Sequence, residues 1–166
     1  YHYPEWHDYF SGTSSHNTIQ FDQADQMPRL SKFLFAKWLV TERVGAIVDD
    51  QLSESWDGAY RDSQGNRHAR SVKLNSKELV VTDKVLGNFK TATLRWRLMP
   101  GCWAFEGDVL KMSGVRIEIK CDNQLASCEL VDGWEARFYQ KKESIPVLQT
   151  NISSGSHEII TRITLS

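Results

Sequence analysis

A short polar stretch near the N-terminus carries the residues whose types best suit chemistry. Residues 10–19 read Phe-Ser-Gly-Thr-Ser-Ser-His-Asn-Thr-Ile and place His16 beside Asn17, directly before a predicted strand. Loops presented by a rigid sheet framework are where functional side chains tend to lie. The alternative is structural, because Ser, Thr and Asn side chains also satisfy the backbone of turns, and His16 would then only cap the strand.

The other histidines are scattered along the chain. His2 and His7 lie in an aromatic-rich first stretch, His68 follows a predicted turn, and His157 follows a Ser-Gly-Ser loop. Histidines and carboxylates that meet in space can bind Zn²⁺. The chain has no His-x-x-x-His or Cys-x-x-Cys spacing, so the spacing itself adds no support for a metal site.

Five basic residues on or near predicted strands could together bind an anionic ligand: Arg95, Arg97, Arg137, Lys141 and Lys142. The simpler interpretation is that they occupy alternate, solvent-facing positions of strands. Nucleophile and phosphate-binding motifs are missing, since the chain contains no Gly-x-Ser-x-Gly, no P-loop and no Gly-x-Gly-x-x-Gly.

Composition narrows the class of protein. The chain has 166 residues, a net charge of -1 and 40% hydrophobic residues, which is ordinary for one globular domain. A general nucleic-acid binder would be distinctly basic, so no nucleic-acid partner is expected. No apolar run approaches the ~20 residues of a membrane span. Cys102, Cys121 and Cys128 lack paired spacing, which predicts packing or semi-buried thiols rather than a disulfide framework.

The elements that must position these residues are strands, because the dominant hydrophobic period is two. Val115–Lys120 and Leu94–Leu98 alternate apolar and charged residues throughout. Turn signals separate such runs and predict about twelve strands. The predicted strands lie near residues 17–21, 32–40, 43–50, 67–74, 78–83, 90–98, 102–106, 108–112, 114–120, 125–131, 134–140, 145–149 and 157–164.

Helices contribute little to this pattern. A short helix near residues 22–30 is the only candidate, and Pro28 weakens it. Residues 1–15 are expected to be loop. Many short antiparallel strands without helices predict an all-β fold, an antiparallel two-sheet β-sandwich of the supersandwich or jelly-roll kind, because each sheet must bury one face.

One stretch resembles a known family. Residues 11–22, followed by Asp25–Arg29, resemble the start of the C-terminal β-sandwich of heparinase II/III-like polysaccharide lyases. Further similar stretches follow in order: Val44–Asp50, Arg67–Ser71, Leu79–Gly87, Leu94–Leu98, Gly133–Trp134, Tyr139–Lys142, Ile145–Leu148 and Ile160–Ile163. The resemblance covers nearly the whole chain and implies a sandwich domain over residues 16–166, preceded by the N-terminal loop of residues 1–15.

The resemblance also implies a partner domain and a reaction. In such lyases an α/α-toroid precedes the sandwich in the same chain, and the substrate cleft lies between the two. The substrate is an anionic polysaccharide that contains uronic acid, such as heparan or alginate. It is cut by β-elimination, in which a base removes the C5 proton and an acid protonates the departing O4. A toroid Tyr and His, with an Asn or Arg, supply most of this chemistry, and the sandwich contributes a His.

His16 matches that sandwich His, and Asn17 follows it as in the family pattern. The resemblance therefore implies that His16 orients or neutralises the substrate carboxylate, or shares in proton transfer. Asn17, Arg95 and Arg97 are the expected substrate-binding residues. The toroid residues are missing from this sequence, so the chain is expected to be a C-terminal piece of a longer protein, without lyase activity alone.

Some relatives use sandwich His and Asp residues to hold a structural Zn²⁺ instead. By this resemblance the zinc ligands here would be His16 and His68, with an aspartate such as Asp22 or Asp50. The sequence is compatible with more than one cellular compartment. Family lyases are often periplasmic or secreted, whereas three cysteines without paired spacing also fit a reducing, cytoplasmic location.

Two other functions also stay open. A non-catalytic carbohydrate-binding or scaffold module would expose tryptophans as a sugar-stacking platform, for which Trp6, Trp56 and Trp103 are the candidates. The other three fall in strand patterns and are expected in the core: Trp38, Trp96 and Trp134. The third function is a heparinase-like protein that makes or remodels a surface polysaccharide rather than digesting one.

Overall fold

The computed structural model describes residues 4–31, 34–44, 48–50, 53–122, 127–138 and 141–165. These residues form one α-helix, one short 3-10 helix and fifteen strands. The helices are α1 (Pro4–Ser11) and η1 (Thr13–Ser15). The strands are β1 (Ile19–Phe21), β2 (Arg29–Ser31), β3 (Leu34–Phe35), β4 (Val40–Val44), β5 (Val48–Asp50), β6 (Ser53–Arg61), β7 (Arg67–Leu74), β8 (Glu78–Leu86), β9 (Thr91–Arg97), β10 (Ala104–Glu106), β11 (Val109–Met112), β12 (Val115–Cys121), β13 (Ser127–Phe138), β14 (Lys141–Ser153) and β15 (His157–Leu165).

The described residues divide into two compact units, each assembled from three separate parts of the chain. The first unit lies within Tyr1–Trp38, Phe89–Gly101 and Leu125–Ser154. The second lies within Leu39–Asn88, Cys102–Gln124 and Gly155–Ser166. Long-range strand pairing, rather than a contiguous segment, therefore defines each unit.

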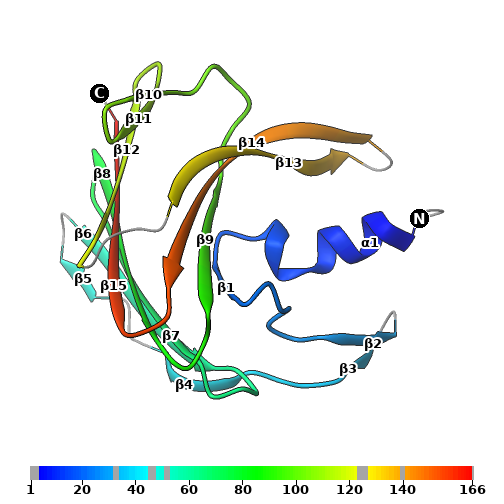
Figure 1. Cartoon of the computed structure of the whole chain (residues 1–166). Coiled ribbons are helices and arrows are strands. Elements are labelled where there is room, and N and C mark those ends of the chain that lie inside the picture. The colour runs from blue at the N-terminus through cyan, green and yellow to red at the C-terminus, as the bar shows by residue number, and fades with distance from the viewer. Residues whose placement is uncertain are drawn as a thin grey trace. The chain divides into compact units, whose positions relative to one another are not determined.

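The first unit contains a four-stranded antiparallel sheet with the order β1-β9-β14-β13 (Figure 1). The period-two pattern of β9 decides which side chains are buried. Leu94 and Trp96 are buried, with 0% and 8% of their surface exposed, so Arg95 and Arg97 lie on the opposite face. Gln149 of β14 pairs with Arg95 in the register and joins it on that face. A separate two-stranded sheet, β2-β3, belongs to the same unit.

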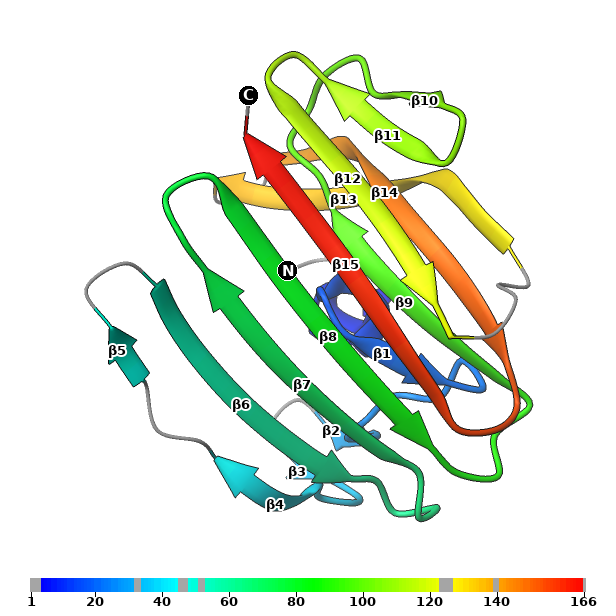
Figure 2. The same cartoon turned by 90° about the vertical axis from the view of Figure 1, so that its left-hand side faces the viewer.

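The second unit contains a nine-stranded antiparallel sheet, which Figure 2 shows face-on. Its order is β10-β11-β12-β15-β8-β7-β6-β4, and β5 also pairs with β6. Its buried apolar side chains alternate along the central strands: Val81, Val85, Leu110, Ile117 and Ile159. The expected all-β, antiparallel fold of the β-sandwich class is confirmed. Among the described residues no helix is long and apolar enough to cross a membrane.

Two predictions about helices were wrong. Residues 1–15 were expected to be loop, but Pro4–Ser11 form α1. Proline is favoured in the first turn of a helix, and Trp6, Tyr9 and Phe10 are spaced so that their rings meet on one side of it. The short helix expected near residues 22–30 is also absent from the structure, which has a turn at Asp22 and the strand β2 from Arg29.

Candidate functional site

His16 ends η1 and is exposed at the point where the chain enters β1. Its Nδ1 lies 2.9 Å from the carbonyl oxygen of Gly12 and 3.2 Å from the hydroxyl of Ser15. A carbonyl oxygen only accepts hydrogen bonds. Nδ1 therefore carries a hydrogen and donates a hydrogen bond to the Gly12 carbonyl. This contact orients the ring and leaves Nε2 as the nitrogen that can act on a ligand.

The loop before His16 is held by a set of side-chain contacts. The backbone N–H of Thr13 donates to Asp25 Oδ1 at 2.7 Å, and the N–H of Gln26 donates to the Thr13 hydroxyl at 2.8 Å. Gly12 is needed here because a Cβ atom would lie 2.9 Å from the carbonyl oxygen of Asp8 and 3.2 Å from Asp25 Oδ1. The polar residues of this stretch therefore do satisfy turn backbone, and in doing so they fix the position of His16.

Asn17 aligns this loop with β9. Its Oδ1 accepts the backbone N–H of Arg97 at 2.7 Å, and the next carbonyl, that of Thr18, accepts the N–H of Arg95 at 3.3 Å. The ladder between β1 and β9 is extended by these two bonds. Asn17 thus has a positioning role in the structure, and its expected contact with substrate remains a prediction.

Arg95 is half-buried, and its guanidinium donates hydrogen bonds to two neutral side-chain amides. Its Nη1 donates to Gln20 Oε1 at 2.6 Å and its Nε to Gln149 Oε1 at 3.1 Å. Burial lowers the pKa of Arg95, an effect that the nearby Tyr9 opposes. No carboxylate of the described residues pairs with this guanidinium.

Arg97 is arranged in a similar way. Its Nη2 donates to the carbonyl oxygen of Trp134, and its Nη1 lies 3.4 Å from the hydroxyl of Tyr9. Within the described ranges it too has no carboxylate partner. The Tyr9 hydroxyl also accepts the backbone N–H of Trp134 at 2.9 Å. Tyr9 therefore connects α1 to both β9 and β13.

Aromatic rings of α1 pack beside these arginines. The Trp6 ring lies 5.4 Å from that of Trp134 and 6.0 Å from that of Phe10, and Lys142 Nζ sits 3.4 Å from the Trp6 ring centre. Lys142 is exposed, and a cation–π contact at an exposed site contributes about 0.5–1 kcal/mol. Lys142 adds a third cation to the group, whereas Arg137 is ion-paired with Glu135 at 2.8 Å.

Sequence reasoning missed Tyr9 because the first residues were expected to be loop. The signal that could have found it is the aromatic spacing of three and four residues at positions 6, 9 and 10, which is typical of one face of a helix. Arg29 secures that helix, donating to His7 Nδ1 at 2.6 Å and to the Ser11 hydroxyl at 2.7 Å.

Three of the expected zinc ligands, His16, His68 and Asp22, make other contacts in the structure, and zinc binding by them remains a prediction. Asp22 Oδ1 accepts the backbone N–H groups of Lys90 and Thr91 at 2.8 and 2.9 Å, which closes a turn in which Asp22 has φ of 49°. His16 uses Nδ1 on a carbonyl, as described above. His68 belongs to the second unit, and the side chain of Asp50 lies outside the described part of the structure.

His68 instead forms part of a buried ionic network in the second unit. Its Nε2 lies 2.6 Å from Asp83 Oδ1, and Arg70 binds both oxygens of the same carboxylate, at 2.6 and 3.0 Å. Burial raises the pKa of Asp83, but the hydrogen bonds from His68 and Arg70 and the charge of Arg70 prevail and lower it. His68 Nδ1 is buried without a hydrogen-bond partner in the described structure. The network has the features of a structural ion pair.

The tryptophans divide differently from the expectation. Trp96 is buried, as predicted, but Trp38 is 69% exposed and the prediction of a core position was wrong. Trp134 is half-buried against Trp6. Trp56 is 41% exposed. None of the three cysteines forms a disulfide in the described structure.

The fold and this site were compared with known proteins. Residues 1–162 match the heparinase II/III-like, C-terminal family. Because the match covers nearly the whole chain, the chain belongs to this family, and the expected resemblance is confirmed. No curated protein matches the chain significantly.

Solved structures give the same fold. The heparinase III titled the BT4657 gene product has a TM-score of 0.78 and 18% sequence identity, covering 98% of this chain and 26% of that one. Heparan sulfate lyase HepC from Pedobacter heparinus has a TM-score of 0.75 and 15% identity, covering 97% of this chain and 25% of that one. The present chain thus spans about a quarter of the length of these proteins.

Proposed function

We propose that this chain is the C-terminal sandwich domain of a lyase that cleaves a uronic-acid-containing polysaccharide by β-elimination. Family membership and the names of the structural neighbours, heparinase III and heparan sulfate lyase, support the proposal. In this proposal an α/α-toroid of the same protein supplies the principal base and acid. The sandwich completes the substrate cleft with His16 and the two arginines of β9.

The observation that carries the proposal is the pair Arg95 and Arg97 on one face of β9. Both guanidinium groups are partly exposed, and both are held by neutral amide, carbonyl or hydroxyl oxygens rather than by carboxylates. A half-buried cation with no counter-ion in the described structure favours an anionic ligand. Guanidinium groups suit carboxylate and sulfate groups because they donate two parallel hydrogen bonds.

A face with two arginines addresses the main chemical difficulty of β-elimination. The C5 proton of a uronate is weakly acidic because a charged carboxylate sits on the same carbon. Neutralising or hydrogen-bonding that carboxylate stabilises the negative charge that develops as the proton leaves. We propose that Arg95 and Arg97 bind acidic groups of the sugar chain and that His16 Nε2 reaches the reacting uronate, with the ring oriented by its bond to Gly12.

The test measures binding of acidic oligosaccharides to the 166-residue chain by calorimetry, with heparan sulfate and alginate fragments as ligands. Arg95→Gln and Arg97→Gln are each expected to weaken binding about tenfold, because each removes one charged hydrogen-bonding group. Arg137→Gln is the matched control. It makes the same charge change in the same unit, but at a residue already paired with Glu135.

Two outcomes would contradict the proposal. If the wild-type chain binds neutral glucans as well as it binds acidic chains, the face has no preference for anions and a general carbohydrate-binding module is the better description. If Arg137→Gln weakens binding as much as the two β9 variants, net charge and not this face decides affinity. Thermal unfolding of each variant separates lost binding from lost folding.

A further inference from the structure

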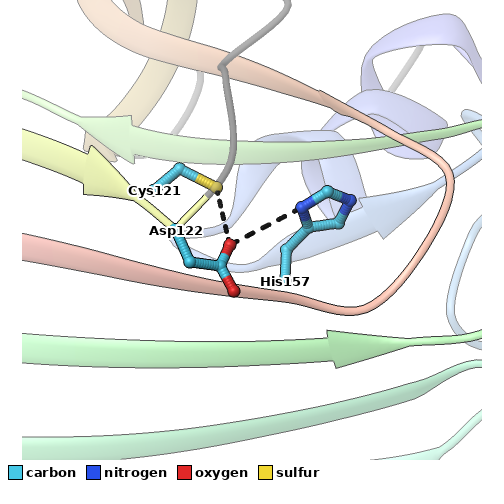
Figure 3. A group of neighbouring side chains, drawn as sticks. All are labelled: Cys121, Asp122 and His157. Atoms are coloured by element: carbon cyan, nitrogen blue, oxygen red, sulfur yellow. Dashed lines mark hydrogen bonds and ion pairs between the residues drawn. The ribbon is translucent and has the colours of Figure 1, made fainter.

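Three side chains with metal-binding atoms converge where β12 ends and β15 begins (Figure 3). One donor atom each from Cys121, Asp122 and His157 lies within 4.8 Å of the other two. The Cys121 sulfur is 3.5 Å from Asp122 Oδ1, and His157 Nδ1 is 3.7 Å from the same oxygen. In the described parts of the chain this is the one such group of three.

The backbone holds these residues in place. Strands β12 and β15 pair antiparallel, with Cys121 opposite Ile159, and the N–H of Asp122 donates to the carbonyl of Glu158 at 3.1 Å. His157 opens β15 and is 6% exposed. Cys121 and His157 thus lie on hydrogen-bonded neighbouring strands of one sheet, and Asp122 directly follows β12.

Gly155 leaves room for the His157 ring. Gly155 has φ of 131°, and a Cβ atom at this position would lie 3.3 Å from His157 Nε2. A side chain there would press on the ring, so glycine allows the imidazole to keep its present orientation. Metal sites need donor groups that are positioned before the ion arrives, and these donors meet that requirement.

The donor set indicates which ion would bind. Thiolate, imidazole and carboxylate are the ligands of Zn²⁺, at roughly 2.0–2.3 Å from the metal, so two ligand atoms of a tetrahedral site lie roughly 3.3–3.6 Å apart. Two of the three separations between donor atoms, 3.5 and 3.7 Å, are close to that spacing, and the third lies within 4.8 Å. Ca²⁺ and Mg²⁺ prefer oxygen ligands and would make poor use of the thiol.

We propose that Cys121, Asp122 and His157 bind one Zn²⁺ ion in the second unit. On binding, the Cys121 thiol releases its proton to solvent, so a thiolate and a carboxylate together balance the charge of the dication. Asp122 is exposed, so a water molecule can take the fourth position. The bound ion would join the end of β12 to the start of β15. This site is independent of the function proposed for His16 and β9.

The test titrates the reduced 166-residue chain with Zn²⁺ in competition with a chromophoric chelator. One equivalent is expected to bind, and the thermal unfolding midpoint is expected to rise with it. Co²⁺ then serves as a spectroscopic probe. A near-ultraviolet thiolate-to-cobalt charge-transfer band and intense visible bands would show sulfur ligation in a tetrahedral site.

Variants decide whether these residues are the ligands. Cys121→Ser, Asp122→Asn and His157→Gln are each expected to weaken Zn²⁺ binding at least tenfold, and Cys121→Ser to abolish the charge-transfer band. Cys102→Ser is the matched control, since Cys102 is an exposed free thiol in the same unit. Asp122 is exposed, so Asp122→Asn is expected to fold even if His157→Gln does not.

Three results would overturn the proposal. The first is no binding in competition with the chelator. The second is binding that survives both Cys121→Ser and Asp122→Asn, which would place the ion elsewhere. The third is a cobalt complex without the charge-transfer band, which would exclude the thiolate.

Discussion

The hydroxyl oxygen of Tyr9 links three elements of the candidate site. Its hydroxyl oxygen meets the Trp134 N–H at 2.9 Å and Arg97 Nη1 at 3.4 Å, so α1, β13 and β9 are linked through it. The same residue opposes the lowering of the Arg95 pKa by burial. A residue outside the strands therefore contacts one arginine of the candidate site and influences the pKa of the other.

Removing that hydroxyl should have a measurable effect. Tyr9→Phe leaves the partly buried N–H of Trp134 without its acceptor, so the free energy of unfolding is expected to fall by about 1 kcal/mol. Urea denaturation measures this change, and calorimetry should show weaker binding of acidic oligosaccharide as Arg97 loses a contact. Unchanged stability and unchanged affinity would show that Tyr9 does not organise the site.

The carboxylate of Asp83 should make stability depend on pH. The hydrogen bonds from His68 and Arg70, with the charge of Arg70, depress the Asp83 pKa below its ordinary value of 3.8, although burial opposes them. The stabilisation of the folded state by ionised Asp83 is therefore fully present at pH values above 3.8. This contribution is lost as the pH falls through the lower pKa of the folded state.

Asp83→Asn tests this contribution directly. It leaves Arg70 without its buried partner and is expected to cost about 3–5 kcal/mol near neutral pH. The difference from wild type should shrink on acidification below the ordinary carboxyl pKa, as followed by urea denaturation. If Asp83→Asn fails to fold, Arg70→Gln provides the same comparison. A difference that stays constant over the acid range would contradict the assigned pKa direction.

At the scale of secondary-structure elements, two Asp-Gly pairs lie within strands rather than in turns. Asp-Gly is a sequence signal for a turn, but Asp57-Gly58 and Asp132-Gly133 lie inside β6 and β13. A Cβ atom at Gly58 would lie 2.4 Å from the Trp56 ring. A Cβ atom at Gly133 would lie 2.5 Å from Val147 Cγ2. Both glycines make room for a neighbouring side chain, which is a known use of glycine within strands.

Gly133→Ala is therefore expected to disturb the site. The new methyl group overlaps Val147 and lies 3.3 Å from the Tyr9 hydroxyl, so unfolding free energy should fall by about 1–3 kcal/mol. Thermal unfolding measures the loss. The double variant with Val147→Ala should recover part of it, because the smaller side chain removes the overlap. A double variant no more stable than Gly133→Ala would contradict this explanation.

Most of the strands could be predicted because alternation is a local property of the sequence. Residues 67–74 coincide with β7, and 114–120 nearly coincide with β12. By contrast, β6 was missed and β13 was divided in two, because a close approach across strands cannot be read from neighbouring residues. The candidate site shows the same limit. Arg95 and Arg97 were identified by their spacing, whereas the contacts of Tyr9 depend on distant partners.

At the scale of the whole molecule, each unit draws its residues from three separated segments. The first unit supplies His16 and the basic face, but β-elimination also needs a base and an acid placed at C5 and O4 of one sugar. The family resemblance assigns those groups to a toroid. Family membership therefore accounts for the fold of this chain more fully than for the reaction proposed above.

The 166-residue chain alone is expected to leave heparan sulfate and alginate uncut. The measurement is the ultraviolet absorbance of the unsaturated uronate product, with a complete heparinase III as the positive control. Turnover by the isolated chain that is lost in His16→Asn would show that the sandwich carries a complete active site. The proposed division of labour between the two domains would then be wrong.

The sequence separation of the Tyr9 contacts also determines when they can form during translation. Tyr9 precedes its partner Trp134 by 125 positions, and Gln20 precedes Arg95 by 75. At about 5–20 residues per second, translation delays the Tyr9–Trp134 contact by roughly 6–25 s. During that interval the apolar residues of α1 and β1 have no finished sheet to join. Within this domain, α1 and β1 are therefore among the last elements to complete their contacts, although they are synthesised before their partner strands.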